Sequence, residues 1–321
     1  VSLPFSSWSY LYPLGVLTAP FAHAGLAHVT GNLIGALVYA PIAEYAWSHY
    51  PEARGASSFG SWRANPYVRA FVVLPLGAAL VGVLTSALAW GPIIGFSGVV
   101  FAFGAFALTR FPLAVVGAVA VEGFVSTAYH ALRDPVVVAS AGPSYGGPWW
   151  AGIAVQGHAT GVFLGVLLGA LLVAHRRERP SAARLWFAAV AYAASVPLYI
   201  IWWYRGPSTY VLYRGLGVLF VVALGLFVAA GVRAGDDALA ERLSLDVSRR
   251  RVAAVCLVFP LVVTAFVAVP VNLTTVAPGP PANSAHAVHV RDYAVTYGER
   301  VPNRRVGAIH VSVLNESTSV N

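Results

Sequence analysis

A single serine interrupts the apolar run GPIIGFSGVVFAFGAF, which spans residues 91–106. Ser97 is flanked by Gly95 and Gly98, which is unusual for a hydroxyl in so apolar a segment. One interpretation is structural, because serines in apolar helices commonly bond to a backbone carbonyl of the preceding turn. The other is a nucleophile, which needs a neighbouring base to remove the hydroxyl proton. The rest of the chain decides between them.

A histidine in a second apolar run can supply that base. His158 lies in the segment VQGHATGVFLGVLLGAL, in which glycines stand at positions 157, 161, 165 and 169. Glycines at every fourth residue form a flat helix face that lets another helix approach closely. We expect this face to pack against the glycine-containing segment around Ser97, which would bring the imidazole to the hydroxyl.

A third run, FAHAGLAHVTGN, carries further polar groups. His28 and Asn32 are four residues apart and therefore lie on one face of a helix, whereas His23 points elsewhere or lies in a loop. With the backbone N–H groups around Ser97, the first two could stabilise a negative oxygen in a low-dielectric site. No carboxylate lies within several residues of these groups, so we expect a Ser–His dyad rather than a Ser–His–Asp triad.

The composition requires a membrane setting for these segments. Of the 321 residues, 58% are hydrophobic and only 10% are charged, with a mean hydropathy of +0.71. Soluble domains carry about 25% charged residues, so the chain is expected to be a polytopic membrane protein. Its net charge of +8 comes from arginines in short loops, which indicates orientation in a bilayer rather than nucleic-acid binding. The one cysteine, Cys256, excludes an intrachain disulfide.

Apolar stretches of membrane-crossing length predict an all-α bundle. We expect eight helices, at residues 27–47, 67–90, 95–110, 112–131, 150–174, 185–204, 209–232 and 252–273. The loops richer in arginine should be cytoplasmic, which places the start of the chain and the tail outside. Acceptor patterns for glycosylation at Asn272 and Asn315 agree with an extracytoplasmic tail, in which residues 286–301 and 306–314 alternate like strands.

The motifs His-x4-His-x3-Asn, Gly-x-Ser-Gly and Gly-His-x2-Gly, in this order, resemble those of the rhomboid intramembrane serine proteases. The resemblance covers residues 14–175, about half of the chain. It implies that Ser97 is the nucleophile and that His158 is the general base and acid. It also implies that His28, Asn32 and the Ser97 amide stabilise the oxyanion, with His23 and Gly95 in support. Substrates would be transmembrane proteins, cut near the outer membrane surface without a cofactor or metal.

The chain departs from the family pattern in four respects. The first helix of the rhomboid core is missing, so we expect a further helix before Val1. A Trp-Arg pair of the family is absent near residues 14–15. Phe101 stands where a tyrosine commonly packs on the histidine, and it can stack on an imidazole without hydrogen bonding to it. Three helices follow the core, where the family usually has none or one.

These expectations define three parts of a cell-membrane protein. They are a protease core at 1–175, three additional helices at 176–275 and a small extracytoplasmic tail at 276–321. A catalytically inactive rhomboid-like protein that binds membrane clients is one alternative, but it should have lost the serine or the histidine. A transporter or a haem or quinone carrier is another, but it should pair its histidines or line a path with charges. In the tail, His286 and His289 lack a nearby carboxylate or cysteine to complete a metal site.

Overall fold

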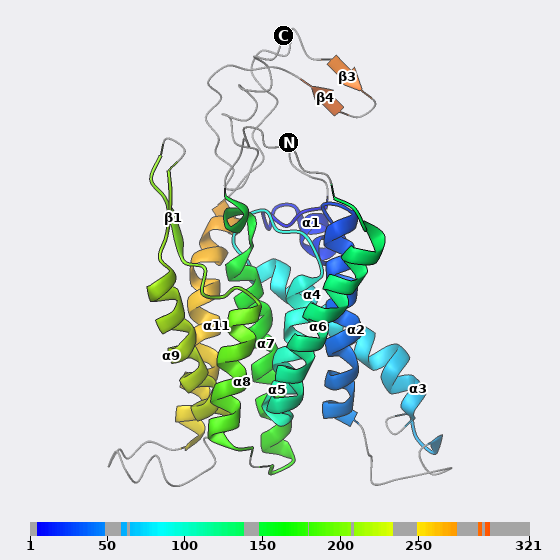
Figure 1. Cartoon of the computed structure of the whole chain (residues 1–321), viewed down its shortest axis with the longest axis vertical. Coiled ribbons are helices and arrows are strands. Elements are labelled where there is room, and N and C mark those ends of the chain that lie inside the picture. The colour runs from blue at the N-terminus through cyan, green and yellow to red at the C-terminus, as the bar shows by residue number, and fades with distance from the viewer. Residues whose placement is uncertain are drawn as a thin grey trace.

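Long apolar helices dominate the chain, as the hydropathy predicts (Figure 1). The computed structural model describes residues 5–48, 59–62, 65–137, 148–178, 180–206, 209–233, 249–274, 288–290 and 293–295. Within these residues, six helices are long and apolar enough to cross a membrane. The chain is therefore a multi-pass, largely helical bundle.

The helices follow one another along the chain with few other elements between them. They are α1 (Pro13–Thr18), η1 (Ala19–Phe21), α2 (Leu26–Ser48), α3 (Pro66–Val68), the π-helical η3 (Arg69–Val73), α4 (Leu74–Leu88), α5 (Ser97–Arg110), α6 (Pro112–Arg133), η4 (Trp149–Gly152), α7 (Val155–His175), α8 (Ala182–Ser195), α9 (Arg214–Val232) and α11 (Arg249–Thr274). Each of the eight predicted helices has a counterpart, and α3, η3 and α4 together form the second of them. The short helices α1 and η1 were not predicted.

The bounds predicted for two helices are wrong, because a short hairpin lies between them. The helix predicted at 185–204 ends at Ser195, and the one predicted at 209–232 begins at Arg214. Between them, β1 (Trp202–Tyr204) and β2 (Tyr210–Leu212) form an antiparallel hairpin. Pro197 explains the early end, because proline lacks the N–H that would continue a helix and its ring clashes with the preceding turn.

The central helix α5 is shorter than α2 and α7. It has 14 residues, or about 21 Å of helix, against 23 residues for α2 and 21 for α7. Most of its side chains are buried, because α2, α4, α6, α7 and α8 all pack against it. A loop at residues 89–96 connects α4 to α5. Because α5 is short, its first residue lies inside the bundle.

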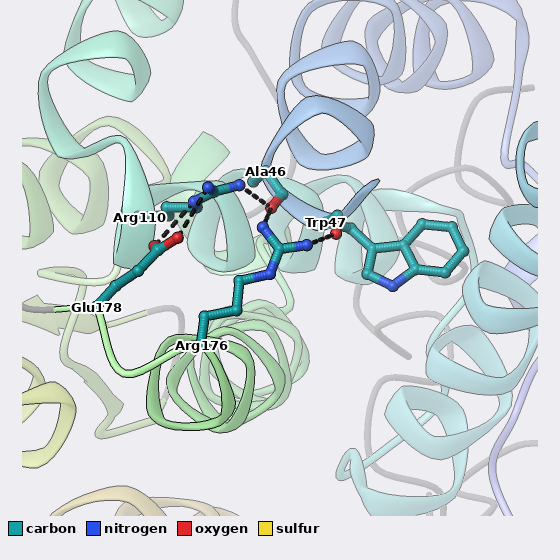
Figure 2. A network of polar contacts seen from close by, with 5 residues as sticks. All are labelled: Ala46, Trp47, Arg110, Arg176 and Glu178. Atoms are coloured by element: carbon teal, nitrogen blue, oxygen red, sulfur yellow. Dashed lines mark hydrogen bonds and ion pairs between the residues drawn. The ribbon is translucent and has the colours of Figure 1, made fainter. Parts of the chain in front are cut away.

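Two arginines join α2, α5 and α7 at the end of the bundle opposite Ser97 (Figure 2). Arg110, the last residue of α5, donates to the Ala46 carbonyl at 2.7 Å and forms an ion pair with Glu178 at 2.8 Å. Arg176, directly after α7, donates to the carbonyls of Ala46 and Trp47. The last carbonyls of a helix have no partner within it, so these cations complete the end of α2. The network therefore opposes sliding of α2, α5 and α7 along their axes.

The predicted glycosylation at Asn272 does not fit the structure. Asn272 lies in the last turn of α11, its side chain is 1% exposed, and its Nδ2 donates to the Ala89 carbonyl at 2.8 Å. A glycan needs an exposed amide nitrogen, so this triplet gives no support to the predicted orientation of the tail. Asn315 lies outside the described residues, as does most of the tail apart from β3 (Val288–Val290) and β4 (Tyr293–Val295), which pair antiparallel.

Candidate active site

Ser97 is the first residue of α5, and the loop before it is held on both sides. Gly95 donates its N–H to the Ala19 carbonyl at 2.8 Å, and Ile93 exchanges two backbone hydrogen bonds of 3.0 Å with Ser7. Gly95 has φ +115°, a conformation that residues with a side chain rarely adopt. The first N–H groups of a helix have no partner within it and carry a partial positive charge. The Ser97 hydroxyl therefore lies at a helix end that favours negative charge.

His158 lies in the first turn of α7 and reaches this hydroxyl. The distance between Ser97 Oγ and His158 Nε2 is 3.2 Å, which is within hydrogen-bonding range. Both residues are partly buried, so the contact lies within the bundle. The predicted contact between the two side chains is therefore present in the structure.

Glycines allow this approach, as expected from their spacing. A Cβ atom at Gly161 would overlap the backbone of Gly98, and one at Gly165 would overlap the backbone of Ala102. Gly169 is enclosed in the same way by Thr109. The contacts advance along both helices in the same direction, so α5 and α7 run parallel with their backbones in contact.

The ring of Phe101 packs edge-on against His158. Their ring centroids are 4.5 Å apart at an interplanar angle of 81°, a favourable aromatic geometry. Phe101 lies one turn after Ser97 on α5, so it limits how far the imidazole can rotate away from the hydroxyl. It provides packing and no hydrogen bond, as its side chain requires.

No third member completes a triad among the described residues. His158 Nδ1 is buried and lacks a hydrogen-bond partner within the part of the chain that the structure covers. Glu122 of α6 accepts a hydrogen bond of 2.6 Å from the Tyr39 hydroxyl. Among the described residues, the contact observed at Ser97 is the one with His158.

Two side chains of α2 face the loop that carries Ser97. A Cβ atom built on Gly95 would lie 2.5 Å from His28 Nε2 and 3.5 Å from Asn32 Nδ2. The absence of a side chain at this position therefore brings both donors to the loop backbone. Asn32 is 8% exposed, and its Nδ2 has no acceptor among the described residues. A buried amide donor without a partner is costly unless it serves a ligand.

The contacts of His28 determine which of its nitrogens can donate. Its Nδ1 accepts a hydrogen bond of 3.4 Å from the Ala24 N–H. In the neutral ring the other nitrogen, Nε2, then carries the hydrogen, and this is the atom next to Gly95. His23 packs edge-on against His28 with ring centroids 5.1 Å apart, so it supports that ring.

Sequence reasoning missed two amides beside the site. Gln156, two residues before His158, bonds to both α4 and α11, and Asn272 bonds to the loop that carries Ser97. The sequence does indicate that each amide has a hydrogen-bonding partner, because a polar side chain within an apolar helix needs one. The identity of that partner was not available, since Asn272 and Ala89 are 183 residues apart.

Comparisons with known proteins leave the chemistry to be inferred from the geometry. No family model, no curated protein and no solved structure matches the chain. Among the described residues there is also no group of three or more metal-binding side chains.

Proposed function

We propose that the chain is a rhomboid-like intramembrane serine protease that cleaves transmembrane proteins. The observation that carries the proposal is the 3.2 Å contact between Ser97 Oγ and His158 Nε2 beside the unpartnered amide donor of Asn32. A nucleophile, a base and an oxyanion donor are what peptide-bond hydrolysis by a serine requires. They come from three different helices, so the grouping depends on the fold.

The reaction proceeds in two halves. In the first, Ser97 Oγ attacks the substrate carbonyl while His158 Nε2 takes the hydroxyl proton, and His158 then gives that proton to the departing amine. In the second, water attacks the acyl-enzyme, its proton passes to His158 and returns to Ser97, and the substrate acid is released. Asn32 Nδ2, His28 Nε2 and the Ser97 N–H donate to the negative oxygen in both halves.

The arginine network supports an orientation for this chemistry. Arg110 and Arg176 lie at the ends of α5 and α7 opposite Ser97 and His158. Arginine-rich ends of membrane helices are usually cytoplasmic. The site would then open toward the outer surface of the cell membrane and the tail would be extracytoplasmic. Transmembrane substrates would be cut near that surface, where water can reach the acyl-enzyme.

An inactive rhomboid-like protein that binds membrane clients is the second candidate. It would explain the apolar bundle, but it gives no reason for an unpartnered buried amide beside a paired serine and histidine.

A fluorophosphonate probe, which labels serines activated by a neighbouring base, separates the two candidates. We expect the full-length protein in detergent or membranes to be labelled, and the label to disappear in Ser97→Ala. The absence of label in both preparations of the wild-type protein would favour the client-binding protein.

A further inference from the structure

We propose that α11 is a positioning element of the active site, and that Asn272 is the residue through which it acts. The inference rests on the proposed function, because it assigns a role to α11 in presenting Ser97. The last of the three added helices, α11 packs against α4, α7 and α9 in the structure. In the C-terminal half of α11, Thr264 accepts a hydrogen bond from Gln156 of α7, and Asn272 donates one to the loop at residues 89–96.

Asn272 joins α11 to two segments of the site. Its Nδ2 donates to the Ala89 carbonyl at 2.8 Å, and its backbone carbonyl accepts from the Tyr10 N–H at 3.0 Å. Ala89 is the first residue of the loop and is itself fully buried. The bond is therefore made where no water replaces it easily, and its loss would leave a buried carbonyl without its donor.

Gln156 makes a second connection between the same elements. Its Oε1 accepts from the Trp90 N–H at 2.7 Å, and its Nε2 donates to the carbonyls of Leu88 at 2.9 Å and of Thr264 in α11 at 2.8 Å. Leu88, Ala89 and Trp90 follow in sequence at the end of α4. Three consecutive residues are thus held by two amides, one from α7 and one from α11.

These contacts bear on the geometry of the reaction because of where the loop leads. Seven residues separate Ala89 from Ser97, and the far part of the loop is fixed at Ile93 and Gly95 by the N-terminal segment. Gln156 lies two residues before His158. The position of the serine relative to the histidine therefore depends on the clamp formed by Asn272 and Gln156, and a shift of about 1 Å at a reacting group can cost about a hundredfold in rate.

The test compares Asn272→Leu with Leu257→Ala in the full chain. The first variant keeps the side-chain volume and removes the bond to Ala89. The second weakens the packing of α11 on Gly231 of α9, and Leu257 lies 15 residues before Asn272 in the same helix. The readouts are hydrogen exchange of peptides covering residues 89–96, the rate of fluorophosphonate labelling, kcat and KM for a transmembrane reporter, and the melting temperature.

We expect Asn272→Leu to speed exchange in the loop and to slow labelling about ten- to a hundredfold, with kcat reduced and KM little changed. Leu257→Ala should lower the melting temperature without either effect. Unchanged loop exchange in Asn272→Leu, or wild-type labelling despite faster exchange, would overturn the proposal. Equal slowing in both variants would also overturn it, since it would indicate general destabilisation. A wild-type protein that is not labelled contradicts the proposed protease function instead, whatever the exchange result.

Discussion

Gly161 of α7 packs directly against the backbone carbonyl of Gly98 in α5, so no side chain fits between the two helices. Gly98 follows Ser97 at once, and Gly161 lies one turn after His158. The closeness of the two backbones therefore holds the side chains of Ser97 and His158 close together.

Substitution of Gly161 by alanine should separate these helices. The added methyl group overlaps the Gly98 carbonyl, so we expect a loss of about 1–3 kcal/mol in the free energy of unfolding and slower labelling of Ser97. Gly117→Ala in α6 is the matched control, because a Cβ atom there has no neighbour within 4 Å. This control should be neutral or stabilising by up to about 1 kcal/mol. Wild-type labelling and melting temperature in Gly161→Ala would show that the close contact is dispensable.

The proposed oxyanion donors, Asn32 and His28, should affect the rate of cleavage more than the binding of substrate. We expect Asn32→Ala and His28→Ala each to lower kcat about a hundredfold with little change in KM, because their hydrogen bonds strengthen as negative charge develops. The measurement is steady-state cleavage of a transmembrane reporter. Leu33→Ala is the control on the same helix, since Leu33 is 58% exposed and faces away from the bundle. A rise in KM alone would instead assign Asn32 and His28 to substrate binding.

Removal of the Arg176 side chain should destabilise the protein without changing the site. Arg176→Ala leaves the carbonyls of Ala46 and Trp47 without this donor, for an expected cost of about 1.5–3 kcal/mol. Arg177→Ala removes the same charge from an exposed neighbour and should cost little. Thermal melting gives the stability, and fluorophosphonate labelling of the folded fraction should match the wild type. Equal melting temperatures for the two variants would contradict the role of Arg176 at the end of α2.

The contacts within the site could be predicted because local spacing determines them. Glycines at every fourth residue predict a close helix face, and the four-residue separation of His28 and Asn32 predicts a shared face. Both patterns are properties of a single helix. The structure then brings Ser97, His158, His28 and Asn32 together through helix packing that these patterns anticipate.

The remaining contacts depend on residues far apart in the sequence. The end of the helix at Ser195 and the hairpin after it depend on Pro197 and on strand pairing, which compete with an apolar run that looks helical throughout. Asn272 matches a glycosylation pattern by its neighbours, yet its function in the fold is set by Ala89. Ser7 is likewise far in the sequence from its partner, Ile93, and its hydrogen bonds order the loop before Ser97.

The most direct test of the Ser97–His158 pair is cleavage of a model transmembrane reporter by the wild-type protein, Ser97→Ala and His158→Ala, all reconstituted in the same vesicles. We expect the wild type to release the two fragments, Ser97→Ala to release none, and His158→Ala to be slower by about a thousandfold or more, because the hydroxyl then lacks its base. All three proteins should melt at similar temperatures. Equal cleavage by the wild type and Ser97→Ala, or no cleavage by any of the three, would contradict the assignment of Ser97 as a nucleophile.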